Sequence, residues 1–107
     1  MGRKKNIEKL KEFKEELGKH VKLNKMILFG SRAKGKATRY SDFDLIVVSS
    51  SFRGKRDLQR GLNFYNYWYE YLDYPVDFLC YTPEEFNKLK KQITIVREAV
   101  KEGIEIK

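Results

Sequence analysis

Apolar residues in the first half of the chain recur at two different spacings. Over residues 6–17 they return every three or four positions, which predicts an amphipathic helix with Lys and Glu on its other face. Two later runs, residues 25–29 and residues 42–49, are instead typical of strands. The second run is apolar on both faces, which indicates a central strand that is covered on both sides.

The segment between these two predicted strands is polar and basic. Residues 31–34 can form one helical turn, with Ser31 as its N-cap and Gly35 at its end. After the second strand, residues 49–56 are polar and predict a loop.

Aromatic residues dominate the next segment, residues 57–73. Apolar positions at alternating four- and three-residue steps predict a single helix there. These positions are Leu58, Leu62, Tyr65, Tyr69 and Leu72. The tyrosines at 65, 67, 69 and 71 also alternate as in a strand, but the length of the segment favours a helix. This helix has no wide polar face, so we expect either a core helix with tyrosine tips in water or an interface, with stacking on nucleic-acid bases as a third interpretation.

The last third of the chain predicts one more strand followed by helix. The strand spans Pro75 to Cys80, and Thr82-Pro83-Glu84-Glu85 is typical of a helix start with a capping box. Helical spacing then continues to Gly103. The order of elements predicts a small α/β (α+β) fold, with a three- to four-stranded mixed sheet flanked by helices.

Composition limits the class of protein. The 107 residues are expected to form a single domain, 1–107. No run is apolar enough to span a membrane and the N-terminus does not resemble a secretion signal, so we expect a cytoplasmic protein. The net charge of +8 suggests an anionic partner. The alternative is a surface rich in both signs, and abundant Lys and Glu with only two Gln also fit a thermophile.

Three aspartates stand at the starts or centres of apolar strands. Asp42 and Asp44 are two residues apart, so on a strand their carboxylates point to the same face. Asp77 lies within the predicted third strand, where a charge is unfavourable unless it is paired or binds a metal. If the two strands are neighbours, the three carboxylates face one site, and Mg²⁺ is the cation that such oxygens prefer. The alternatives are a solvated charge pair and a salt bridge from Asp77.

A glycine and a serine follow the first strand and open the predicted helical turn. Gly30 allows a phosphate to approach the backbone, and Ser31 adds a hydroxyl donor, although a plain tight turn also fits. The connection to Asp42 is basic and suits a triphosphate. Its cationic residues are Arg32, Lys34, Lys36 and Arg39.

These residues together resemble a known signature. Ile27-Leu28-Phe29-Gly30-Ser31-Arg32-Ala33-Lys34-Gly35 and then Ser41-Asp42-Phe43-Asp44-Leu45 are similar to the Gly-Ser and Asp-x-Asp motifs of the minimal nucleotidyltransferases. These proteins belong to the DNA polymerase β-like nucleotidyltransferase superfamily. The resemblance covers residues 25–48, and Asp77 falls where that family carries its third carboxylate.

The resemblance implies a two-metal mechanism. Asp42, Asp44 and Asp77 would be the catalytic carboxylates and the ligands of two Mg²⁺ ions. Gly30, Ser31, Arg32 and Arg39 would bind the nucleotide, with Arg32 near the leaving pyrophosphate. The expected reaction is transfer of AMP from ATP to a hydroxyl.

The resemblance also implies a partner. Small members of this family often act as antitoxins beside a HEPN-type toxin and can adenylylate one of its tyrosines. A homodimer is a second way to present the acceptor. Two alternatives remain: a non-catalytic antitoxin or nucleotide-binding module that acts by contact, which the three aspartates disfavour, and a basic nucleic-acid-binding protein.

Overall fold

Four strands form one mixed sheet in a computed structural model that describes residues 3–107. The strands are β1 (Leu23–Phe29), β2 (Phe43–Ser49), β3 (Val76–Tyr81) and β4 (Ile104–Glu105). The sheet order is β3-β2-β1-β4; β1 is antiparallel to both β2 and β4, whereas β2 and β3 are parallel. This arrangement confirms the predicted α+β class with a mixed sheet.

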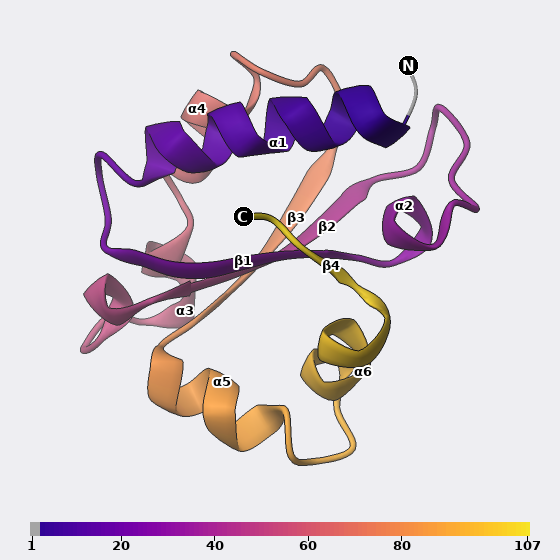
Figure 1. Cartoon of the computed structure of the whole chain (residues 1–107). Helices are drawn as coiled ribbons and strands as arrows, with labels where there is room; N and C mark the ends of the chain where they lie inside the picture. Colours follow the sequence, from indigo (N-terminus) through magenta and orange to yellow (C-terminus); the bar gives the residue numbers. More distant parts are fainter. Residues whose placement is uncertain (1–2) are drawn as a thin grey trace.

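Helices cover both faces of the sheet. They are α1 (Arg3–Leu17), α2 (Ser31–Lys34), α3 (Asp57–Arg60), α4 (Phe64–Trp68), α5 (Pro83–Leu89) and α6 (Ile95–Glu102), with a 3₁₀ turn, η1 (Ser50–Phe52). In Figure 1, α1 and α4 lie on one side of the sheet and α5 and α6 on the other. Within residues 3–107, no helix is long and apolar enough to cross a membrane.

The strand β2 divides the core into two layers. Phe43, Leu45 and Val47 pack in the layer that contains α1 and α4. Ile46 and Val48 pack in the other layer, with α5 and α6. This alternation follows from the two-residue period of a strand, and it places Asp44 on the same face as Ile46.

The predicted N-terminal helix is confirmed, and it begins earlier than expected, at Arg3. Its apolar positions Leu10, Phe13 and Leu17 are fully buried. Phe13 packs edge-on against Trp68, with 5.1 Å between ring centroids. Burying a side chain of this size typically stabilises a fold by about 1.5–3 kcal/mol, so α1 is held by this stripe.

The prediction of one helix over residues 57–73 is wrong. Two short helices, α3 and α4, replace it, and most of the predicted apolar face is exposed: Leu58 is 88% and Leu62 68% exposed. Of the predicted apolar positions only Leu72 is buried, and it packs with Phe64 and Trp68, which were not on the predicted face. The four-residue step between these three is equally helical, so spacing alone did not identify the face that packs on the sheet.

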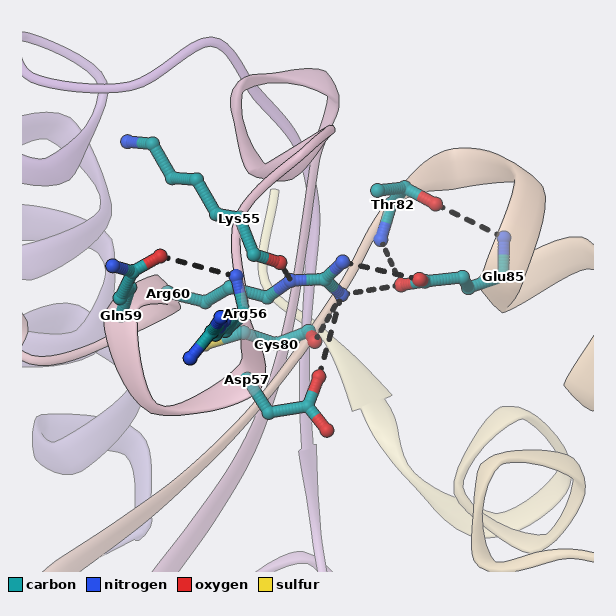
Figure 2. A network of polar contacts seen from close by, with 8 residues as sticks. All are labelled: Lys55, Arg56, Asp57, Gln59, Arg60, Cys80, Thr82 and Glu85. Atoms are coloured by element: carbon teal, nitrogen blue, oxygen red, sulfur yellow. Dashed lines mark hydrogen bonds and ion pairs between the residues drawn. The ribbon is translucent and has the colours of Figure 1, made fainter.

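The turn between α3 and α4 is held against the sheet and α5 by contacts of two residues. At Gly61, an added Cβ would lie 3.1 Å from the Cys80 sulfur, so the turn packs tightly on β3. The neighbouring Arg60 is buried, donates to the backbone carbonyls of Lys55 and Cys80, and forms an ion pair with Glu85 on α5 (Figure 2). Arg60 therefore ties α3 to β3 and α5.

Other predicted elements need smaller corrections. The capping box of Thr82 and Glu85 is confirmed, but the helix it starts ends at Leu89, and Thr94 caps a separate helix, α6. The expected loop after β2 contains η1, whose Phe52 is buried. Gly30, and not Ser31, is the N-cap of α2, while Gly35 ends that helix as predicted. The short strand β4 was not predicted.

Candidate active site

Two carboxylates lie side by side on one face of the sheet. Asp44 on β2 is paired in register with Asp77 on the parallel strand β3. Side chains paired in register on neighbouring strands share a face, so both carboxylates lie on the α5 and α6 side. Both line a cavity of about 480 Å³, whose other wall includes Ile95, Glu98 and Glu102 of α6.

Asp44 bears the electrostatic effect of this arrangement. Burial raises the pKa of Asp44 above its ordinary value, and the nearby charges of Asp77 and Asp42 raise that pKa further. Like charges at short range disfavour joint ionisation. A cation bound between the carboxylates would relieve this repulsion.

The three predicted carboxylates are neighbours but are not equally placed. Asp42 precedes β2 by one residue, is exposed, and does not line the cavity, whereas Asp44 and Asp77 do. Within residues 3–107, no group of three or more His, Cys, Asp or Glu side chains is arranged closely enough to hold a metal ion. Asp44 and Asp77 therefore form the centre of the site, with Asp42 at its rim.

Gly30 is in close contact with Asp44. It has φ 74° and ψ −159°, a conformation that side chains with a Cβ rarely adopt. A Cβ built on Gly30 would lie 2.5 Å from Oδ2 of Asp44. Glycine is therefore required twice at this position, once by the backbone and once by the carboxylate. Ser31 follows as the first residue of α2.

The basic residues of the connection point in different directions. Lys34 lines the cavity, and its Nζ lies 3.1 Å from Glu102 on α6. Arg32 donates instead to the backbone carbonyl of Ser41. Arg39 donates to the hydroxyl of its neighbour Tyr40 and stacks over the same ring. The structure thus brings Lys34, but neither predicted arginine, into the cavity lining.

The sequence did not predict that residues of α6 line the cavity. Glu98 and Glu102 look like ordinary charges on a solvated helix, and only their i, i+4 spacing shows that they share a face. In the described part of the chain, the cavity lining has four carboxylates and one ammonium group. An anionic ligand can enter such a cavity only together with cations.

Comparison with known proteins identifies the class. A sequence model of the nucleotidyltransferase domain matches residues 10–102, which is most of the chain. The chain belongs to this family, whose general activity is nucleotidyl transfer. Its fold is similar to the crystal structure of a protein from Sulfolobus solfataricus described as a candidate nucleotidyltransferase. The two have a TM-score of 0.63 and 21% sequence identity, over 92% of this chain and 77% of that one. The comparison with curated proteins found no match.

Proposed function

We propose that this protein transfers a nucleoside monophosphate from a nucleoside triphosphate, with ATP as the preferred donor, to a hydroxyl acceptor. The observation that carries the proposal is the pairing of Asp44 and Asp77 in register on one wall of the cavity, with Gly30 in contact with Asp44. Membership of the nucleotidyltransferase family supports the general reaction. The choice of ATP rests on the resemblance in sequence.

Asp44 and Asp77 fit a divalent metal ion. Mg²⁺ is usually bound through one or two carboxylates together with substrate phosphates. Burial and the charges of Asp77 and Asp42 raise the pKa of Asp44, and a bound cation would offset that effect. Asp42 lies at the rim of the site, and its charge adds to the negative potential at Asp44. Two Mg²⁺ ions held by these residues would neutralise the carboxylates and the triphosphate.

The residues of the chain then have separate tasks. Gly30 and Ser31 would bind the terminal phosphates, and Lys34 would exchange its contact with Glu102 for one with phosphate. Asp77 is exposed on β3, at the edge of the sheet, where an acceptor can approach. There it would accept a hydrogen bond from the acceptor hydroxyl and orient it.

The reaction balances as one substitution at phosphorus. The acceptor oxygen forms a bond to the α-phosphorus, and the bond between that phosphorus and the bridging oxygen of pyrophosphate breaks. Pyrophosphate leaves with the electron pair, and the proton of the hydroxyl passes to solvent. Positioning and electrostatics supply most of the rate in reactions of this kind.

We further propose that the acceptor is a tyrosine of a HEPN-type toxin, which makes this protein its antitoxin. This identification of the acceptor rests on the resemblance of the Gly-Ser and Asp-x-Asp motifs.

The test uses labelled ATP. The protein, Mg²⁺ and α-labelled ATP are incubated with a purified HEPN-type protein or with tyrosine peptides. Label is expected to reach the acceptor, and γ-labelled ATP should give none. Asp77→Asn should abolish transfer, whereas Asp73→Asn, an exposed aspartate outside the cavity, should not. Transfer of the γ label would indicate a kinase and defeat the proposal.

One observation favours the non-catalytic alternative, a module that binds a partner or a nucleotide by contact. The described residues hold no closed group of three metal-binding side chains. The combined variant Asp42→Asn and Asp44→Asn separates the two functions. If it still neutralises the toxin as well as the unaltered protein does, contact and not transfer is the activity.

A further inference from the structure

The side chain of Arg32 is bonded to the backbone of its own chain and does not line the cavity. Its Nε and Nη2 both donate to the backbone carbonyl oxygen of Ser41, over 3.1 and 2.8 Å. Ser41 directly precedes Asp42, the first aspartate of the Asp-x-Asp motif. The two hydrogen bonds therefore join α2 to the start of the metal-binding segment.

Aromatic rings hold the guanidinium group of Arg32 in this place. Its central carbon lies 4.4 Å from the ring centroid of Phe43 and 4.6 Å from that of Tyr74. Phe43 is fully buried in the layer of α1 and α4, on the face of β2 opposite to Asp44. Arg32 thus lies over the far side of the strand, and no ion pair found among residues 3–107 includes it.

The segment that Arg32 holds lacks other regular support. The strand β2 begins at Phe43, whose backbone N–H donates to the carbonyl of Pro75, so Asp42 lies before the first ladder hydrogen bond. Ser41 is otherwise fixed by Thr38, which exchanges backbone and hydroxyl hydrogen bonds with it in a tight turn. Among residues 3–107, the two hydrogen bonds of Arg32 are the ones that join this turn directly to α2.

We propose that Arg32 is a positioning residue, which fixes Ser41 so that Asp42 and Asp44 keep the arrangement needed to bind divalent metal. This inference rests on the proposed function, since it concerns the same aspartates. It replaces the expectation from sequence that Arg32 neutralises the leaving pyrophosphate. The two roles differ in what they need, because positioning requires the planar fork and the stacked rings, whereas neutralisation requires only positive charge.

The test compares Arg32→Lys with Arg53→Lys, which removes a two-pronged arginine contact with the Glu84 carboxylate outside the cavity. Binding of Mn²⁺ alone is measured by calorimetry, and the kcat and the KM for ATP are measured with a tyrosine peptide as acceptor. Melting temperatures without metal show whether each variant is folded. Tyr74→Leu, which removes one stacked ring, is a second variant in case Arg32→Lys does not fold.

Arg32→Lys is expected to weaken Mn²⁺ binding by about 10-fold or more, as loss of a residue that orients metal ligands typically does. The kcat should fall with it while the KM for ATP stays nearly constant, and Arg53→Lys should change none of these. A raised KM for ATP with unaltered Mn²⁺ binding, or full rescue by Lys, would overturn the inference. If the unaltered protein binds Mn²⁺ but transfers nothing, the proposed function fails, and the Mn²⁺ affinities still decide the role of Arg32. If it binds no Mn²⁺, both fail.

Discussion

Replacing Gly30 by alanine is expected to lower both the stability of the fold and the rate of nucleotidyl transfer, for two different reasons. The backbone at Gly30 has φ 74° and ψ −159°, and a residue with a Cβ in such a conformation costs about 1–3 kcal/mol. The new Cβ would also lie 2.5 Å from Oδ2 and 3.3 Å from Cγ of Asp44. The carboxylate can rotate away at little cost to stability, but it then leaves the position in which it faces Asp77.

Gly54 provides a matched control for this substitution. It also has a positive φ, 77°, but a Cβ there would meet nothing within 4 Å. Both Gly30→Ala and Gly54→Ala should therefore lower the melting temperature, by about 4–8 °C for each kcal/mol in a domain of this size. Only Gly30→Ala should lose nucleotidyl transfer, by about 100-fold, because displacing a catalytic group by about 1 Å has effects of that order.

The assays are thermal unfolding without metal and transfer from α-labelled ATP. Unaltered transfer by Gly30→Ala would refute the reasoning, because it would show that the position of Asp44 does not matter. An equal loss of transfer in Gly54→Ala would also refute it, since backbone strain alone would then explain both. In an Asp44→Ala background, Gly30→Ala should cost only its backbone strain.

Three further outcomes are expected. Burial and the charges of Asp77 and Asp42 raise the pKa of Asp44, so the metal-free protein should lose stability as the pH rises through that raised pKa. Asp44→Asn should remove this loss and increase the melting temperature at pH 7. A pH profile of stability that is the same in Asp44→Asn would contradict this prediction. Lys34→Ala should raise the KM for ATP with little change in kcat, whereas Lys36→Ala, outside the cavity lining, should leave both the same. Arg60→Ala removes a buried guanidinium that donates to the carbonyls of Lys55 and Cys80 and pairs with the partly exposed Glu85, so it should destabilise the fold by about 1–3 kcal/mol in denaturant titrations. Leu58→Ser, at an exposed position, should be neutral.

The central features of the site could be predicted from sequence because they follow from short-range rules. The two-residue period of a strand sets the face of Asp44 relative to Phe43. The position of Asp77 within an apolar run is a local signal too. The sequence does not determine that β2 and β3 are neighbours; the register of Asp44 with Asp77 shows that they are.

Features that depend on contacts distant in sequence could not be predicted. The helix expected over residues 57–73 is interrupted at Gly61, which packs against Cys80, about twenty positions later. The partners of Arg32 and Lys34 likewise come from other segments, the carbonyl of Ser41 and the carboxylate of Glu102. A basic loop shows how much charge is present, but the fold decides which side chain faces the cavity.

The parallel pairing of β2 with β3 in one register is required both for the correct fold and for a complete site. A slip of one residue between these strands would turn Asp77 into the apolar layer of α1 and α4 and bring Phe78 to the cavity face. Such a molecule would lose one carboxylate of the proposed metal site and bury a charge at once. If the proposed metal site exists, titrating it in a preparation would also count the molecules in which β2 and β3 are paired in the correct register.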